Sequence, residues 1–263
     1  MNNRSHILAD NNLVESIREH ARWQDESECV EEHGLLLLAG ATDLPVPYQN
    51  CLIRTDPSIS AQEVLDRARV FFGTRSKAFM LLVREGQDRD LDVLCQTTGL
   101  KLRANTPCML INHPFGPVDA PDGIRAERFT EERHVQDAIR VNSEAYSVLG
   151  LNRELVRAIY GNPSRLLSGN AEGYVLYRGN RPVSTAMAIF SGQGAGVYWV
   201  GTVPEAQGAG LATICTRLAT NAGFHHGASI VTLQASPYGE PIYRRLGYKM
   251  YDRLKFYAHR KQK

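Results

Sequence analysis

Hydrophobic positions along the chain follow two periods, one typical of buried strands and one typical of amphipathic helices. Continuous apolar runs have the length of strands, and apolar residues spaced three and four apart indicate helices. The first part of the chain predicts a helix at Asn12–Trp23, an apolar run at Gly34–Gly40, a strand at Tyr48–Thr55, a helix at Ser60–Phe72, a strand at Lys77–Arg84, a helix at Arg89–Thr97 and a strand at Pro107–Ile111. This alternation favours an α/β or α+β domain around a central sheet.

The segment Asn112–Gly123 separates this part from the rest of the chain. It holds three prolines and two glycines in twelve residues and follows neither period, so we interpret it as a linker. A length of 263 residues fits one large domain or two modest ones. We therefore expect two domains, at residues 1–117 and 118–263.

The pattern after the linker is clearer. It predicts a strand at Ile124–Phe129, helices at Glu131–Tyr146 and Arg153–Tyr160, strands at Glu172–Arg178, Pro182–Phe190 and Gly196–Val203, a helix from Leu211 to Gly223 or Gly227, a strand at Ser229–Gln234, a helix at Gly239–Leu246 and a final extended segment at Tyr248–His259. Short turns between the three middle strands indicate an antiparallel meander.

Composition and charge exclude several classes of protein. The chain is 43% hydrophobic and 22% charged, which is typical of a folded globular protein and not of a disordered or fibrous one. No apolar run approaches the roughly 18 residues that span a bilayer, and the polar start is not a secretory signal, so we expect no membrane partner. Five scattered cysteines without a C-x-x-C pair suggest reduced thiols and a cytoplasmic location. A net charge of +2 argues against nucleic acid as the main partner.

A strand, a glycine-rich turn and a helix follow one another directly after Thr202. The turn contains Gln207-Gly208-Ala209-Gly210, and the amphipathic helix begins at Leu211. The first turn of a helix presents unpaired N–H groups and a partial positive charge, and glycine lets a phosphate approach the backbone. The pattern therefore predicts an anion site, with a tight turn whose glycines serve packing alone as the alternative.

Two common phosphate loops do not match this segment. A Walker loop requires a Gly-Lys pair, which occurs nowhere in the chain. A dinucleotide fingerprint requires a third glycine where Thr213 stands, and an acid at the end of the next strand, which instead closes with Gln234-Ala235-Ser236.

A third loop fits better. Gln207-x-x-Gly210-x-Ala212 resembles the [Q/R]-x-x-G-x-[G/A] pyrophosphate loop of the GNAT superfamily of acyl-CoA N-acyltransferases. The later segment Leu233–Tyr248 resembles the same superfamily's strand and helix ending in Tyr-x-x-x-Gly-[Phe/Tyr]. The order of elements from Ile124 to His259 is also that of the family, so the resemblance covers about half of the chain.

The resemblance implies a fold, a reaction and a set of contacts. It implies a mixed, mostly antiparallel sheet flanked by helices, and transfer of an acetyl group from acetyl-CoA to an amine with no metal. The implied acyl-CoA contacts are Thr202, Val203, Gln207, Gly208, Ala209, Gly210, Leu211, Ala212, Thr213, Ser236 and Gly239. Many family members have Asn and Ala at the last two of these positions, which puts the contribution of Ser236 in doubt.

Two residues receive catalytic roles from the resemblance. Tyr243 would be the general acid for the departing thiolate, and Glu144 the base for the amine, with Tyr146 as a second candidate. Each has a structural alternative: Tyr243 as an aromatic residue packed on the sheet, and Glu144 as a solvated residue at a helix end. Tyr198 and Trp199 would line the acceptor groove, although neighbouring strand residues alternate faces and one of them should point into the core.

A weak internal repeat extends the resemblance to the first half. Leu94–Leu102 parallels Ile242–Met250 when Gly99 is aligned with Gly247, and Cys95 then stands where Tyr243 stands. No Q-x-x-G-x-A loop precedes Phe79. We therefore expect residues 1–117 to form a degenerate, non-catalytic GNAT-like domain that walls the acceptor site of a catalytic domain at residues 118–263.

The sequence thus predicts an acetyl-CoA-dependent N-acetyltransferase whose acceptor is a small-molecule or peptide amine. A non-catalytic acyl-CoA-binding or interaction module is the alternative. Transfer to a protein or to aminoacyl-tRNA is less favoured, because the near-neutral charge does not suggest a basic face. The oligomeric state stays open, with a homodimer among the options.

Overall fold

The computed structural model describes residues 3–147 and 150–259. Its first part contains α1 (Asn3–Trp23), β1 (Glu28–Glu32), β2 (Leu35–Ala39), β3 (Asn50–Arg54), α2 (Ala61–Thr74), β4 (Phe79–Arg84), α3 (Arg89–Thr97) and β5 (Lys101–Ile111). Its second part contains β6 (Ile124–Arg128), α4 (Glu132–Ala145), α5 (Arg153–Tyr160), α6 (Pro163–Leu167), β7 (Ala171–Arg178), β8 (Arg181–Ser191), β9 (Gly194–Thr202), a 3₁₀ turn η2 (Pro204–Ala206), α7 (Leu211–His225), β10 (Ile230–Gln234), α8 (Glu240–Arg245) and β11 (Lys249–His259).

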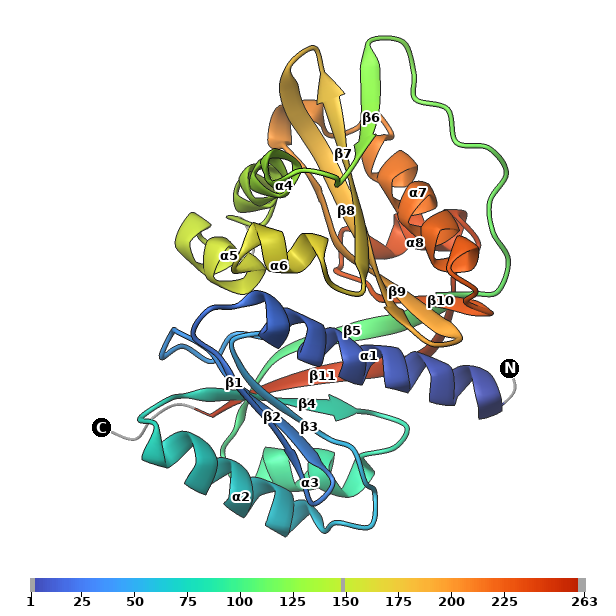
Figure 1. Cartoon of the computed structure of the whole chain (residues 1–263). Helices are drawn as coiled ribbons and strands as arrows, with labels where there is room; N and C mark the ends of the chain where they lie inside the picture. Colours follow the sequence, from blue (N-terminus) through green and yellow to red (C-terminus); the bar gives the residue numbers. More distant parts are fainter. Residues whose placement is uncertain (1–2, 148–149, 260–263) are drawn as a thin grey trace.

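All strands of the described residues join one sheet, in the order β1-β2-β3-β4-β11-β5-β10-β9-β8-β7-β6 (Figure 1). Most neighbouring strands are antiparallel, and the β3–β4 and β9–β10 pairs are parallel. This is the mixed, mostly antiparallel α/β architecture that the sequence predicts.

The final strands of the two halves are exchanged. β5 ends the first half, yet residues Cys108–Ile111 pair with β10 of the second half. β11 ends the chain and lies between β4 and β5 of the first half. The division between residues 117 and 118 stays a prediction. On each side of it, a strand pairs with a strand from the other side.

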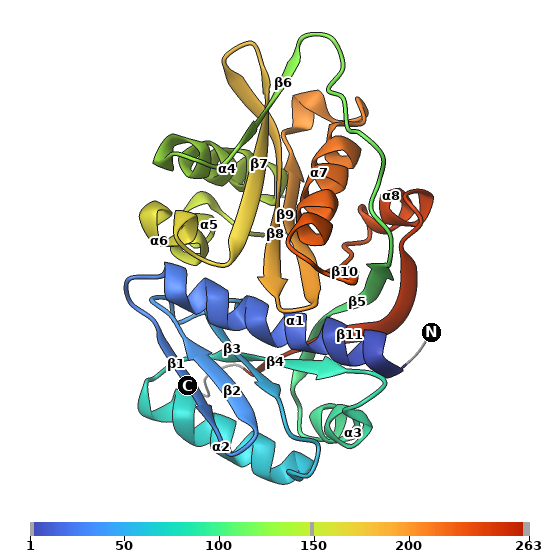
Figure 2. The same cartoon turned by 45° about the vertical axis from the view of Figure 1, so that its right-hand side comes forward.

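Each half has helices on both faces of its sheet. In the first half, α2 and α3 cover one face and α1 the other. In the second half, α7 and α8 cover one face, and α4, α5 and α6 cover the other (Figure 2). The core of the second half therefore consists of two layers separated by β7, β8 and β9.

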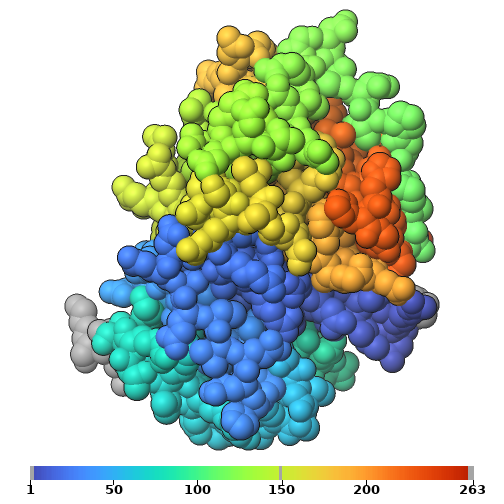
Figure 3. All heavy atoms as spheres, viewed as in Figure 1, coloured from blue at the N-terminus to red at the C-terminus, as the bar shows by residue number. Residues whose placement is uncertain are grey.

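Helix α1 is shared by the two halves. It contacts β1 and β2 of the first half and β8, β9 and β10 of the second. Figure 3 shows the blue N-terminal segment packed directly against the yellow and orange segments of the second half. Buried Trp23 accordingly belongs to the same apolar cluster as residues of α4 and α5.

Several predicted boundaries are wrong for reasons of tertiary contact. α1 begins at Asn3, because its first turns pack through Ala9 against Leu110 and Ile230 of strands far along the chain. β5 is eleven residues long, since it pairs with β11 along most of its length and with β10 at its end. The polar edge strand β1 and the single-turn helix α6 have no strong hydrophobic period, and the sequence predicts neither.

The segment 112–123 has no helix or strand and runs along the outside of α7 (Figure 1). Asn221 of α7 accepts a hydrogen bond from the Phe115 backbone at 2.8 Å, and Arg217 donates to the Pro117 carbonyl at 3.1 Å. None of the described helices combines the length and apolar character needed to cross a membrane.

Candidate functional site

Strands β9 and β10 separate partway along their length. They pair in parallel only at Gly194, Ala195 and Gly196 of β9, whereas β9 continues to Thr202 and stays paired with β8 to that point. Beyond Gly196, no strand of residues 3–147 or 150–259 pairs with the edge of β9 that faces β10. Backbone N–H and C=O groups on such an edge are available to a ligand.

The glycine-rich turn lies at the end of β9 and opens α7. Gly208 and Gly210 have φ values of +79° and +74°, in the left-handed region that glycine adopts without strain. A Cβ atom at either position would meet nothing within 4 Å, so both backbones face open space.

Helix α7 begins without a cap. Gly210 is its N-cap residue, no side chain bonds to the first turn, and that turn contains no acidic residue. The N–H groups of residues 211–213 have no partner within the helix, because the first intrahelical bond joins the Ile214 N–H to the Gly210 carbonyl. Together with the dipole of a 15-residue helix, these donors form an anion-binding end.

The other residues predicted to contact acyl-CoA around the turn differ in how far their side chains are buried. The side chains of Leu211 and Val203 are buried in the core, and the Val203 backbone bonds to Val183 and Ala206. Thr202 is also buried, with its hydroxyl 2.9 Å from that of Ser184. Gln207 is exposed and its amide lies 3.4 Å from the Thr202 carbonyl, and Ala209 is likewise exposed. Ala212 and Thr213 are half-buried in the first turn of α7.

Tyr243 lies on α8, in the apolar cluster that contains α7. Its side chain is 8% exposed, and no described residue forms a hydrogen bond with its hydroxyl. Burial raises the pKa of Tyr243 well above its ordinary value, and the nearby Tyr146 and Tyr248 phenols add to that rise. The phenol is therefore neutral, with its proton free for a ligand.

Gly239 makes room for the Tyr243 ring. A Cβ on Gly239 would lie 2.7 Å from Cε2 of Tyr243, closer than real Cβ contacts allow. Ser236 begins the same turn, and its Oγ accepts a hydrogen bond from the Gly239 N–H at 3.1 Å. Ser236 thus has a local structural role, which does not depend on a ligand.

Glu144 stands on the last turn of α4 and is not buried, with 42% of its side chain exposed. Its carboxylate is 4.0 Å from Arg181, which also forms an ion pair with Glu205 of η2. Tyr146, just after the helix, donates a hydrogen bond to the Val200 carbonyl of β9 at 3.0 Å. Of the two candidate bases, Tyr146 is the one in contact with the open strand, and its pKa is raised by burial.

Tyr198 and Trp199 do not alternate faces as expected. Both are buried in the cluster formed with α4, α5 and α6, because β9 contains a bulge at this point. The Tyr198 hydroxyl donates to Asn12 at 2.8 Å, and the Trp199 indole N–H donates to His20 at 2.8 Å. The first half of the chain therefore walls this side of β9, through α1.

Sequence reasoning missed His20, Asn12 and Asn142 as residues of this region. Asn142 lies over Gly201, and Asn12 over Gly196, so close that a side chain on either glycine would clash. Gly196 and Gly201 were the available sequence signal, because glycines inside a strand often mark a bulge or a close approach of another segment. The partner of each glycine lies on a distant element, and the sequence does not reveal it.

The equivalent region of the first half is closed. β3 ends at Arg54, one residue after its last pairing with β4, so the two strands do not separate. Arg54 is buried and bonds to Asp88 at 3.0 Å, and Arg84 bonds to the same carboxylate at 2.9 Å. These paired charges occupy the end of β3 and β4.

Helix α2, which follows β3 as α7 follows β9, is also unsuited to an anion. Ser60 caps it by accepting a hydrogen bond from the Glu63 N–H, and Glu63 places a negative charge in the first turn. Cys95, aligned with Tyr243 in the repeat, is fully buried, and burial raises its thiol pKa to about 12.

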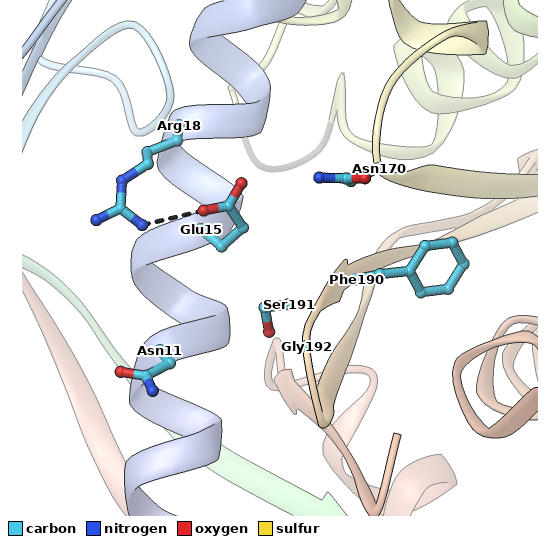
Figure 4. Close-up of a pocket in the computed structure, with 7 residues that line it drawn as sticks. All are labelled: Asn11, Glu15, Arg18, Asn170, Phe190, Ser191 and Gly192. Atoms are coloured by element: carbon cyan, nitrogen blue, oxygen red, sulfur yellow. Dashed lines mark hydrogen bonds and ion pairs between the residues drawn. The ribbon is translucent and has the colours of Figure 1, made fainter. Parts of the chain in front are cut away.

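A surface hollow lies elsewhere, between α1 and the β8–β9 turn (Figure 4). Its lining consists of Asn11, Glu15, Arg18, Asn170, Phe190, Ser191 and Gly192. This hollow is at the opposite end of β9 from Thr202, and Arg18 already pairs with Glu15 at 3.0 Å. It is separate from the anion-binding end of α7.

Comparisons with known proteins agree with this arrangement. Residues 120–247 match the family model described as an acetyltransferase (GNAT) domain. A GCN5-related N-acetyltransferase from Kribbella flavida is similar in structure over 97% of this chain and 96% of its own, with a TM-score of 0.73 and 19% identity. No curated protein matches the chain.

Two further solved structures share the fold. A tandem GNAT protein from the clavulanic acid biosynthesis pathway is similar over 90% of this chain and 84% of its own, with a TM-score of 0.63 and 13% identity. A functionally unknown conserved protein from Staphylococcus epidermidis is similar over 90% of this chain and 95% of its own, with a TM-score of 0.62 and 14% identity.

Residues 120–247 therefore match an acetyltransferase (GNAT) domain, and the fold that spans the chain is GNAT-like. Acyl transfer is the general chemistry of that family. The open end of β9 and the uncapped start of α7 both lie within this domain.

Proposed function

We propose that the protein transfers an acetyl group from acetyl-CoA to a primary amine by direct attack in a ternary complex. The observation that carries the proposal is the juxtaposition of two features at one end of β9. An uncapped helix N-terminus follows two left-handed glycines, and the strand before it has an edge without a partner.

The residues fit the acyl donor. The N–H groups from Gly208 to Thr213 would hold the pyrophosphate, with no side chain at Gly208 or Gly210 to obstruct it. The edge of β9 that β10 leaves unpaired would bond the pantetheine arm up to Thr202. Val203 would lie beside the arm, because its N–H and carbonyl bond to Val183 and Ala206. The donor supplies a thioester carbonyl, and the backbone beside it would stabilise negative charge on the oxygen during attack.

The reaction forms a C–N bond and breaks the C–S bond, and the amine loses a proton while the thiolate gains one. Reference pKa values are near 10 for tyrosine and about 8.5 for a thiol, so transfer from Tyr243 to the thiolate is uphill. Burial raises the pKa of Tyr243 further. Tyr243 would therefore act by donating a hydrogen bond to the developing thiolate, with full proton transfer only late in the step.

The amine must be neutral to attack, although an alkyl amine has a reference pKa near 10.4. Glu144 stays our proposed base, acting through water because it lies at the surface. Its attraction to Arg181 competes with that role. Tyr146 contacts β9 directly but already donates its proton to the Val200 carbonyl, which leaves its oxygen as an acceptor.

Net charge and cysteine pairing support the class of acceptor and the cell compartment that we propose. The near-neutral net charge supports a small-molecule or peptide amine over nucleic acid. Every cysteine of the chain is unpaired, which supports a reducing cytoplasm. Seven of the proposed acyl-CoA contacts, from Gln207 to Thr213, lie in the loop and first turn, and their role is the same for any acyl chain.

A non-catalytic acyl-CoA-binding module is the second candidate. The specific observation in its favour is Glu144, whose half-buried side chain lies 4.0 Å from the cation of Arg181. Such a module would bind acetyl-CoA as the acetyltransferase would, but it would transfer no acetyl group.

One experiment separates the two. Release of the CoA thiol is followed with the purified chain, acetyl-CoA and a panel of amines, while calorimetry measures acetyl-CoA binding. Amine-dependent thiol release supports the acetyltransferase. Binding without release on any amine supports the module, and absence of binding contradicts both.

A further inference from the structure

The bulge in β9 is the point at which the two halves of the chain meet the open strand. Pairing with β8 joins Met187 to Tyr198 and Thr185 to Gly201, so Trp199 and Val200 together face one residue of β8. Trp199 has a φ of +56°, a left-handed conformation that bulky residues rarely adopt. Such a conformation persists only where its surroundings hold it.

Three side chains hold the bulge. Asn142 donates to the Trp199 carbonyl at 3.3 Å, and Tyr146 donates to the Val200 carbonyl at 3.0 Å. Both stand at the end of α4, in the acetyltransferase domain. The third is His20, whose Nε2 accepts the Trp199 indole N–H at 2.8 Å and which stands on α1 of the first half.

His20 is itself fixed in place. Its Nδ1 lies 2.6 Å from the Ser16 carbonyl, and its ring stacks on Tyr48 with centroids 3.8 Å apart. A backbone carbonyl only accepts, so Nδ1 carries the hydrogen and Nε2 is left as the acceptor. The ring is fully buried. The tautomer and the orientation therefore both suit the indole donor.

We propose that His20 is a positioning residue for acyl transfer. Through its hydrogen bond to Trp199, His20 lets α1 hold the bulge that positions residues 200–202, on the edge of β9 that β10 leaves unpaired, beside the acyl group. The inference rests on the proposed function, and it gives the first half a role in catalysis although that half has no acyl-CoA site of its own.

The test is a double-mutant cycle across this hydrogen bond. Trp199→Phe removes the donor, His20→Phe removes the acceptor and keeps a ring to stack on Tyr48, and the third variant combines them. We expect each single variant to lower kcat about tenfold or more, with the KM for acetyl-CoA within about twofold, because the pyrophosphate end of the site is unchanged. The double variant should lose no more than either single one, since both remove the same interaction.

A matched control and a rescue variant separate positioning from general destabilisation. Trp23→Phe removes the indole donor on α1 that bonds to Glu19 at 3.0 Å, and it keeps an aromatic ring beside His20, from which the Trp23 ring lies 4.5 Å between centroids. We expect its kcat to stay within about twofold of the wild type. His20→Gln offers an amide oxygen near the place of Nε2, and we expect it to recover most of the kcat that His20→Phe loses.

Fluorescence provides a readout that does not depend on turnover. The chain has two tryptophans, so Trp23→Phe leaves Trp199 as the single reporter. Acetyl-CoA should change the Trp199 emission in this background. Adding His20→Phe should shift the emission of the free protein and reduce the change on binding.

The outcomes distinguish this inference from the function on which it rests. A wild-type chain that neither binds acetyl-CoA nor releases thiol refutes the proposed function, and the inference with it. An active wild type whose Trp199→Phe and His20→Phe variants match the Trp23→Phe kcat overturns the inference alone. If His20→Phe does not fold, Trp199→Phe decides, because it leaves α1 intact.

Discussion

Tyr243 carries the most specific chemical prediction at the scale of single residues. Its hydroxyl has no hydrogen-bond partner among the described residues, and its ring is held over Gly239. Tyr243→Phe keeps the ring and removes only the donor. We expect kcat to fall by about a hundred- to ten-thousandfold, the usual range for loss of a general acid, while acetyl-CoA affinity stays nearly unchanged.

Steady-state kinetics and calorimetry on the same samples check this prediction. Equal kcat for Tyr243→Phe and the wild type would remove the acid role, and the residue would then serve only to pack α8 against the sheet. A parallel fall in affinity would instead mean that the ring had moved.

His20 predicts a pH dependence of stability with a definite sign. Burial lowers its pKa from 6.5 to about 3, so the unfolded chain binds a proton in this range that the folded chain does not. The stabilisation present above pH 6.5 is therefore lost as the pH falls toward 3, with a slope of up to about 1.4 kcal/mol per pH unit.

Comparing urea unfolding of the wild type and His20→Gln isolates this contribution. Asp10 acts in the opposite direction, because burial raises its pKa to about 6, but it is present in both proteins and cancels. We expect the wild type to lose stability relative to His20→Gln on going from pH 7 to pH 4.5. A constant difference would mean that His20 is not buried as a neutral ring.

At the scale of elements, the start of α7 is where we propose that the chain binds its acyl donor. Gly210→Ala and Gly210→Glu form a matched pair, since both place a side chain at a φ of +74° and share a strain of about 1–2 kcal/mol. Only the glutamate adds negative charge at the anion site. We expect Gly210→Glu to weaken acetyl-CoA binding at least about a hundredfold more than Gly210→Ala.

Equilibrium titration of both variants, with circular dichroism to verify folding, measures the difference. Similar affinities for the two variants would show that the pyrophosphate does not lie at this helix end.

The elements around the site differ in how far the sequence predicts them. The turn and α7 follow from local features, namely left-handed glycines and apolar residues spaced along one helix face. The bulge at Trp199 does not follow from local features, because it depends on His20, which lies 179 residues earlier in the chain. Similarly, the pattern predicts β11 as an extended segment, but its place between β4 and β5 is set by partners far away in sequence.

At the scale of the whole molecule, the exchanged strands couple the two halves. β11 pairs with β4 and β5, and the end of β5 pairs with β10. Neither half can unfold without breaking the strand pairing of the other. We expect a single cooperative transition for the chain, with equal calorimetric and van't Hoff enthalpies.

Differential scanning calorimetry with and without acetyl-CoA checks this coupling. Ligand should raise the temperature of the whole transition, because it binds only the native chain. Two resolved transitions, of which acetyl-CoA shifts one, would mean that the halves are independent despite the shared sheet.

The central claim is that one acyl-CoA site serves both halves, at the start of α7. Among the described residues of the first half, the matching helix start is unsuited to a second site, since Ser60 caps α2, Glu63 charges its first turn, and Arg54 and Asp88 fill the end of β3. Isothermal titration of acetyl-CoA into the full-length chain measures the stoichiometry directly. The structure predicts one acetyl-CoA per chain; two per chain, or none, would contradict it.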